Sequence, residues 1–278
     1  MTVAAGLARI RLVHPFPSLL NSALVFGLAS LAGGTGLRAA VLALGMVGLQ
    51  FCIGAVNDLV DAPLDAVGKP WKAIPAGLVS RRTATVIALA AGGGGLALAG
   101  IAGPASLAMA AAMLACGLAY DLWLKPTRLG WACFAVAFAI LPVYAWHGAT
   151  GELPPRWDFL VPLAALAGPM IQLSNALADL ERDRRSGLTT LATRLERRSA
   201  LVLVALLVAI IYVLAWLTLA PMTAAPVAPI ALATVIALAG LALSAAKKPN
   251  LRELGWMVQA TSVALLGYAW LSAVRLSP

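Results

Sequence analysis

Residues 57–65 read Asn57-Asp58-Leu59-Val60-Asp61-Ala62-Pro63-Leu64-Asp65, and this polar segment follows directly on a long apolar run. Asn57, Asp61 and Asp65 are spaced by four residues, so on a helix they lie on one face. Carboxylates one helical turn apart repel each other, and one that faces lipid costs at least about 2.5 kcal/mol. The spacing therefore indicates a cation among them, and a hard divalent cation held by oxygen ligands is the usual choice.

The same spacing occurs again later in the chain, at Asn175, Asp179 and Asp183. This segment also follows an apolar run, and basic residues come after it. The two segments together hold six of the eleven acidic residues, namely Asp58, Asp61, Asp65, Asp179, Glu181 and Asp183. Two such helix ends facing each other would form one site in which Mg²⁺ ions hold a polyphosphate.

The composition of the 278-residue chain is that of a helical membrane protein, with 62% hydrophobic and 11% charged residues. Soluble domains hold about 25% charged residues. The long apolar runs also lack the alternation that a membrane β-barrel requires. We therefore expect an all-α, polytopic protein in the lipid bilayer. The net charge of +9 would favour nucleic acid as the partner of a soluble protein. Basic loops that orient the helices explain it here, so no nucleic-acid partner is expected.

The first apolar run follows Arg9 and Arg11, as the core of a signal peptide would. It is too long for a signal peptide, contains Pro15 and Pro17, and is followed by further apolar runs. We interpret it as a first helix that is retained.

The apolar runs predict nine membrane-spanning helices around a central cavity, in a single domain of residues 1–278. The expected spans are 12–33, 38–57, 83–102, 104–124, 129–149, 158–179, 199–220, 224–246 and 253–275. With this assignment, all lysines and arginines lie on one side except Arg38, Arg156 and Arg275. The positive-inside rule then places the N-terminus and both aspartate-rich segments in the cytoplasm and the C-terminus outside. We expect the inner or plasma membrane of the cell as the location.

Three lysines near the aspartates suggest that an anion binds as well. Lys69 and Lys72 lie in a loop, 68–80, that is rich in Gly and Pro and follows the first motif. A metal site does not need them, whereas a bound phosphate group does. Lys125, near the end of the fourth span, fits the same role, and an ordinary lysine at the membrane interface fits its position equally well.

Other residues within or near the spans have less specific readings. Asn21 lies inside the first span, where it either joins helices or faces a cavity. His14 precedes a proline and reads as an interfacial residue. The run Gly92–Gly95 permits close helix packing, and Asp121 is a weak candidate for a general base.

With these motifs in place, the chain resembles the UbiA-type intramembrane prenyltransferases. That family shows Asn-Asp-x-x-Asp-x-x-x-Asp after the second helix, matched here by residues 57–65. A Lys-Pro loop ending in Pro-x-Gly follows, matched by residues 69–77. After the sixth helix comes Asp-x-x-x-Asp with Gly and Thr, matched by residues 179–190. A Tyr-x-x-x-x-Lys pattern is met by Tyr120 and Lys125.

The resemblance implies a fold, a reaction and a cofactor. Nine helices would surround a cavity with an apolar tunnel open toward lipid. An isoprenyl diphosphate donor would bind there through Mg²⁺ and ionise. The allylic cation would then be transferred to an aromatic or other lipophilic acceptor.

The resemblance also implies roles for single residues. The catalytic aspartates would be Asp61, Asp65, Asp179 and Asp183. The magnesium ligands, or their close supports, would be Asn57, Asp58, Asp61, Asp65, Asn175, Asp179 and Asp183. Asp58 would otherwise orient a ligand or contact a basic neighbour. Lys69, Lys72 and Lys125 would contact the diphosphate, and Asn21 and Tyr120 are possible cavity residues.

A cation-coupled transporter is the alternative, since intramembrane carboxylates and repeated motifs also occur in that class. The carboxylates here lie at helix ends, the lysines suit an anion, and an even number of spans separates the motifs, so they point the same way. These features favour the enzyme. The acceptor stays open among an aromatic ring, a quinone precursor, a tetrapyrrole and a phosphate-bearing alcohol, and so does the donor length.

Overall fold

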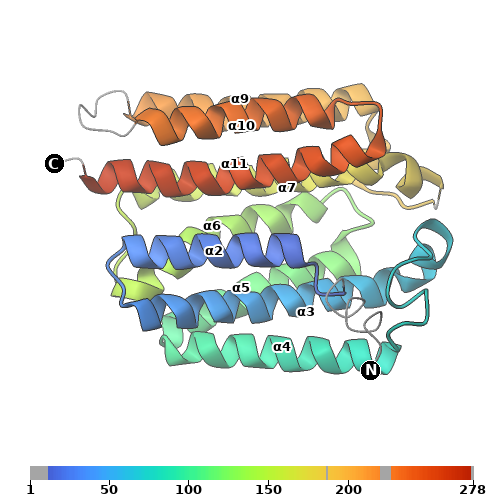
Figure 1. Cartoon of the computed structure of the whole chain (residues 1–278), viewed down its shortest axis with the longest axis horizontal. Coiled ribbons are helices and arrows are strands. Elements are labelled where there is room, and N and C mark those ends of the chain that lie inside the picture. Colours follow the sequence, from blue (N-terminus) through green and yellow to red (C-terminus); the bar gives the residue numbers. More distant parts are fainter. Residues whose placement is uncertain (1–11, 186, 220–226, 277–278) are drawn as a thin grey trace.

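The computed structural model describes residues 12–185, 187–219 and 227–276. This part of the chain is helical and contains no strand. Figure 1 shows long helices lying side by side along the longest axis of the molecule. In chain order the elements are α2 (Pro15–Leu31), α3 (Gly36–Gly68), α4 (Arg81–Ile101), α5 (Pro104–Ala119), the π-helical turn η1 (Tyr120–Leu124), α6 (Gly130–Thr150), α7 (Trp157–Arg185), α8 (Leu191–Arg194), α9 (Arg197–Leu219), α10 (Val227–Ser244) and α11 (Pro249–Leu276).

Among the described residues, eight helical segments are long and apolar enough to cross a membrane, with α5 and η1 forming one of them. A further helix, α2, is apolar but has 17 residues. A helix lies in each of the nine predicted ranges. The all-α class is thus confirmed, and the count of nine is approximate because it depends on the shorter α2.

Several helices continue beyond the predicted membrane spans. The second span was expected to end at residue 57, but α3 continues to Gly68, and the sixth was expected to end at 179, but α7 continues to Arg185. Hydropathy marks where apolar surface stops, whereas polar side chains on one face leave the backbone hydrogen bonds of a helix intact. Both motifs are therefore helical, and their four-residue spacing does place them on one face.

Two helices also begin at other residues than the predicted spans, which start at residues 12 and 253. Helix α2 begins at Pro15 and α11 at Pro249, because proline is well suited to the first turn of a helix. Arg9 and Arg11, and residues 224–226 at the start of the predicted eighth span, lie outside the described residues.

The outer surface of the bundle carries large apolar side chains. Many of them on α4, α9 and α10 are more than half exposed, among them Val86, Leu89, Leu206, Val213, Leu217, Val235 and Leu238. Such a surface would promote association in water, whereas lipid tails solvate it. Together with the long apolar helices, this surface identifies a multi-pass membrane protein.

Glycines bring α3 and α4 into backbone contact. A Cβ atom on Gly48 would lie 2.6 Å from the carbonyl oxygen of Ala91, and one on Gly95 would lie 2.8 Å from that of Gly45. Small residues permit such close approach in membranes, where dispersion contacts replace the hydrophobic effect. Gly92 and Gly95 of the glycine run thus pack against α3, whereas Gly93 and Gly94 meet nothing within 4 Å.

Helices α3 and α7 end at the same end of the bundle, on the right in Figure 1. Loop 69–80 leaves α3 there and turns back on itself, since the N–H groups of Leu78 and Val79 both donate to the carbonyl of Ala73 at 3.0 Å. The hydroxyl of Ser80 then caps the start of α4. The loop therefore stays close to the first motif.

Candidate active site

A cavity of about 720 Å³ lies between α2, α3, α5, α6, α7 and α11. Six residues of the two predicted motifs line it, namely Asn57, Asp61, Asp65, Asn175, Asp179 and Asp183. The predicted lysines and both possible cavity residues line it too, namely Lys69, Lys72, Lys125, Asn21 and Tyr120. Asp58 is not one of its lining residues. The structure thus brings together two motifs that lie far apart in the sequence.

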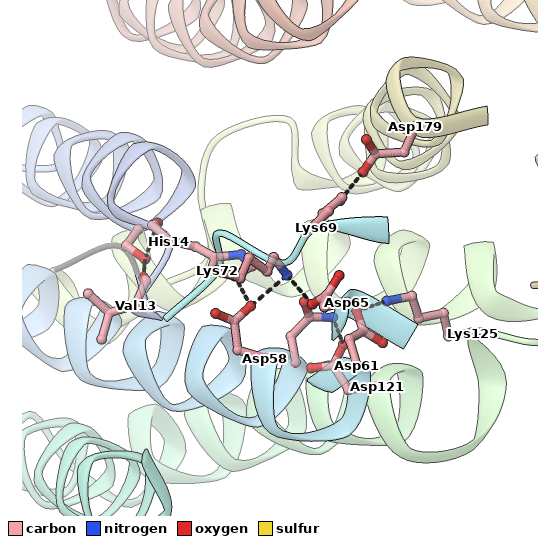
Figure 2. A network of polar contacts seen from close by, with 12 residues as sticks. Val13, His14, Asp58, Asp61, Asp65, Lys69, Lys72, Asp121, Lys125 and Asp179 are labelled. Atoms are coloured by element: carbon pink, nitrogen blue, oxygen red, sulfur yellow. Dashed lines mark hydrogen bonds and ion pairs between the residues drawn. The ribbon is translucent and has the colours of Figure 1, made fainter. Parts of the chain in front are cut away.

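Lys72 binds two aspartates of the first motif, as Figure 2 shows. Its Nζ lies 2.8 Å from Oδ1 of Asp58 and 2.7 Å from Oδ2 of Asp65. Both residues are buried, at 3% and 7% exposed. Burial by itself lowers the pKa of Lys72, but the two carboxylates outweigh it and hold this pKa above its usual value. Lys72 is therefore a protonated internal counter-ion.

Asp58 has a second basic neighbour, which the sequence did not reveal. Nε2 of His14 lies 3.0 Å from Oδ1 of Asp58. His14 has a positive φ of 48°, and Gly54 on α3 leaves room for it, since a Cβ there would lie 3.3 Å from its ring. His14 was interpreted as an interfacial residue, because no spacing rule connects it to Asp58. Of the roles expected for Asp58, the structure shows the contact with basic neighbours.

Lys69 connects the loop after α3 to the second motif. Its Nζ lies 2.5 Å from Oδ2 of Asp179 on α7. The other oxygen of Asp179 accepts a hydrogen bond of 2.6 Å from Nη1 of Arg182. The guanidinium of Arg182 in turn lies 5.8 Å from the ring centroid of Trp71. Asp179 is thus held between its own helix and the loop.

Lys125 binds Asp61 from the end of the π-turn η1 (Figure 2). The N–H of Lys125 donates to the carbonyl of Tyr120, five residues earlier, at 2.8 Å. This wider turn brings Lys125, rather than Leu124, to the cavity. Burial by itself lowers the pKa of Lys125, but Asp61 outweighs it and holds this pKa above its usual value. Of the two readings of Lys125, the structure supports a place in the site.

Asn57 is held by a carboxylate of the same turn. Its Nδ2 donates to Oδ1 of Asp121 at 2.8 Å, and Asp121 is 4% exposed. The aromatic ring of Tyr120 packs edge-on against Phe134, with centroids 4.9 Å apart. The sequence offered Asp121 as a weak general-base candidate and gave no signal for its contact with Asn57.

The second motif is less enclosed than the first. Asn175 is exposed, and Asp183 lies within electrostatic reach of Asp179. Thr190 lines the cavity and caps the short helix α8. Glu181, although part of the same acidic segment, forms a two-bond ion pair with Arg252 of α11 at 2.6 and 2.7 Å.

The oxygen donors of the cavity suit a hard divalent cation. The two motifs alone contribute four carboxylates and two carboxamides to its lining, and Mg²⁺ is bound by such groups together with phosphate oxygens. Across residues 12–185, 187–219 and 227–276, no three His, Cys, Asp or Glu side chains converge closely enough to hold an ion. Lysines neutralise Asp61, Asp65 and Asp179 instead. These oxygen atoms suit Mg²⁺ once the lysines leave the carboxylates and bind an anion instead.

Comparison with known sequences gives a consistent family. A model described as the UbiA prenyltransferase family matches residues 19–255. Digeranylgeranylglyceryl phosphate synthase of Halobacterium salinarum is 32% identical over 206 residues, which cover 73% of this chain and 74% of that protein. The enzyme of the same name from Korarchaeum cryptofilum is 31% identical over 154 residues, covering 55% of this chain and 54% of that protein. Some matches thus span about half the relative's length.

Solved structures show the same fold. A UbiA homolog from Archaeoglobus fulgidus bound to GPP and Mg²⁺ has a TM-score of 0.72 and 20% identity, covering 95% of this chain and 99% of that one. A structure of a digeranylgeranylglyceryl phosphate synthase has a TM-score of 0.68 and 14% identity, covering 97% and 98%.

Proposed function

Since this chain belongs to the UbiA prenyltransferase family, we propose that it transfers an isoprenyl group from an isoprenyl diphosphate to a lipophilic acceptor. One observation carries the proposal. The aspartates of α3 and α7 and three lysines meet at the polar end of a cavity whose other lining is largely apolar. A diphosphate fits the polar end and an isoprenyl tail fits the rest.

The lysines supply much of the charge that the leaving group needs. Lys69, Lys72 and Lys125 would move from their carboxylates to the diphosphate oxygens and stabilise the charge that develops as the C–O bond breaks. Mg²⁺, when bound by oxygens of Asn57, Asp61, Asp65, Asn175, Asp179 and Asp183, would supply further positive charge to these oxygens. The aspartates would thus bind Mg²⁺ in place of the lysine ammonium groups.

The apolar lining protects the reactive cation. Excluding water prevents hydrolysis of an allylic cation before the acceptor attacks it. The side chains suited to this, and to binding the isoprenyl tail, include Leu24, Ile53, Phe138, Leu141, Ile171 and Val263.

For the acceptor, we favour a phosphate-bearing lipid alcohol among the candidates. The relatives are named for a product, digeranylgeranylglyceryl phosphate, that carries isoprenyl groups on glyceryl phosphate. An aromatic acceptor is the competing class, and the experiment below includes both.

The position of the two motifs and the lysines beside them argue against a cation-coupled transporter. In a transporter with inverted repeats, the ion site lies near the membrane midplane. Here both motif helices end at the same end of the bundle (Figure 1), and Lys69 binds Asp179 there. Three lysines beside the aspartates suit an anionic substrate better than a transported cation.

We also propose that the chain acts as one domain in the inner or plasma membrane. The N-terminus and the site would face the cytoplasm, and the C-terminus the outside. The distribution of basic residues supports this orientation. A membrane-impermeant thiol reagent applied to intact cells should label Glu152→Cys and not Lys247→Cys.

The function is tested by incubating purified protein in detergent with geranyl, farnesyl and geranylgeranyl diphosphate. Each donor is combined with glycerophosphate-type lipid alcohols and with aromatic acceptors, with and without Mg²⁺. An acceptor that gains the mass of an isoprenyl group, with release of diphosphate, is the expected result. Folded protein that yields neither product nor diphosphate with any pair would contradict the proposal, and ion-flux assays in liposomes would follow.

A further inference from the structure

Asp121 is a cavity carboxylate that belongs to neither aspartate motif. It lies on the π-turn Tyr120–Leu124, lines the cavity and is 4% exposed. Its Oδ1 accepts the hydrogen bond from Nδ2 of Asn57 at 2.8 Å. Its Oδ2 is buried and has no hydrogen-bond partner within the described part of the chain.

This contact fixes which end of the Asn57 amide faces which way. A carboxylate oxygen accepts hydrogen bonds, so the group that Asn57 turns toward Asp121 is its NH₂. The amide oxygen is consequently directed away from Asp121. Asn57 lines the cavity, and the oxygen is the atom that a hard cation requires.

Two side chains at the π-turn contact two residues of the first motif that lie one helical turn apart. Asp121 holds Asn57, and Lys125, four residues later, holds Asp61, which is itself four residues after Asn57. The polarity is matched in each pair, with an acceptor for the amide and a donor for the carboxylate. The turn thus orients two adjacent members of the motif together.

A hydrogen bond to Asn57 alone does not require a carboxyl group at this place. Accepting one hydrogen bond from an amide requires a neutral oxygen only, whereas a buried carboxylate with an unpartnered oxygen is costly. A cation in the same cavity would offset that cost.

Building on the proposed function, we infer that Asp121 is a positioning residue for the metal site. It holds the Asn57 amide with its oxygen available to Mg²⁺. Groups that orient metal ligands in this way typically change metal affinity by about 10- to 100-fold when they are removed.

The test measures binding rather than turnover. An unreactive thiodiphosphate analogue of geranyl diphosphate is bound to detergent-purified protein over a series of Mg²⁺ concentrations. Asp121→Ala should require about 10- to 100-fold more Mg²⁺ for half-maximal binding. Asp121→Asn keeps an oxygen at this place and should need an intermediate concentration. Leu122→Ala, which removes an exposed side chain from the same turn, should match the wild type.

A charge-swapped pair covers the case in which Asp121→Ala does not fold. Asn57→Asp alone would place two carboxylates against each other and weaken Mg²⁺-dependent binding, and adding Asp121→Asn should restore much of it. Wild-type behaviour of Asp121→Ala, or equal loss in Asp121→Asn and Asp121→Ala, would overturn the inference. Wild-type protein that binds the analogue without any response to Mg²⁺ would instead overturn the proposed function.

Discussion

Nζ of Lys69 lies 2.5 Å from Oδ2 of Asp179, so the loop that follows α3 is bound directly to the second aspartate motif on α7. Lys72 also binds Asp65, and Lys125 binds Asp61, so three aspartates of the cavity are neutralised from within the chain. A divalent cation must displace these lysines. Displacement is easier when a diphosphate is present to receive them.

We therefore predict that Mg²⁺ binds weakly without an anion. Lys69→Met frees Asp179 from one competitor and should strengthen the binding of Mg²⁺ alone by roughly tenfold, about 1.4 kcal/mol. The same variant should weaken binding of an isoprenyl diphosphate, because it removes one cation from the phosphate site. Isothermal titration with Mg²⁺ alone and with donor analogue checks both. Lys247→Met, at an exposed position, is the control. If Lys69→Met weakened the binding of Mg²⁺ alone as well as that of the donor analogue, Lys69 would not compete with Mg²⁺ for Asp179.

The aspartates that line the cavity should be needed for transfer. We predict that Asp61→Asn and Asp179→Asn each reduce the rate at least ~100-fold, about 2.7 kcal/mol of transition-state stabilisation, while the protein still inserts and folds. Asp61→Ala and Asp179→Ala should abolish transfer. Asp158→Asn, which alters an exposed carboxylate 3.8 Å from Arg156, should keep full activity. Undiminished turnover in an Asp61 or Asp179 variant is incompatible with the assigned site.

Removing Mg²⁺ should stop the reaction. Excess EDTA should abolish product formation, and added Mg²⁺ should restore it, because three lysines do not supply the charge that the departing diphosphate requires. Product masses before and after chelation are the measurement. Full activity in EDTA would refute a role for the metal.

Lys72 should stabilise the folded protein as well as bind substrate. Lys72→Met leaves Asp58 and Asp65 without their shared cation, and an uncompensated buried charge costs about 3 kcal/mol or more. The pKa of Lys72 is raised in the folded state, so its contribution is complete below its ordinary pKa of about 10.4 and is lost as pH rises through the higher folded value.

The stability difference between wild type and Lys72→Met should accordingly stay constant from about pH 7.5 to about pH 9. Unfolding in mixed micelles, titrated with a denaturing detergent, measures it. A difference that disappears within this range would show that Lys72 is not held as a protonated counter-ion.

Two glycines of one helix should respond in opposite ways. Gly95→Ala places a Cβ atom 2.8 Å from the backbone of α3 and should destabilise the protein by about 1–3 kcal/mol. Gly93→Ala meets nothing within 4 Å and should be neutral or stabilising by up to about 1 kcal/mol. Equal effects on thermal stability would contradict the packing of α3 against α4.

Site residues that lie on the same helix could be predicted from the sequence. Asn57, Asp61 and Asp65 are separated by whole turns, so their common face was predictable from spacing. Asn175, Asp179 and Asp183 were predictable in the same way. That both motifs line one cavity was expected from the topology, and the structure places them there.

The partners of these residues were not predictable, because they depend on how separate helices meet. No local pattern connects His14 with Asp58, or Asp121 with Asn57. Glu181 belongs to the second acidic segment of the sequence, but its side chain pairs with Arg252 on α11. The helices extend beyond the predicted spans for a related reason, since hydropathy marks the apolar surface of a helix and not its last backbone hydrogen bond.

The π-turn at Tyr120–Leu124 also limits how this chain can change in length. Each residue of an α-helix turns the chain by about 100°. Deleting one residue within this turn would restore a regular helix and rotate either Asp121 or Lys125 away from α3. A deletion here would therefore separate the turn from Asn57 or Asp61 without altering any of the side chains that meet there. In this segment the number of residues is constrained as tightly as their identity.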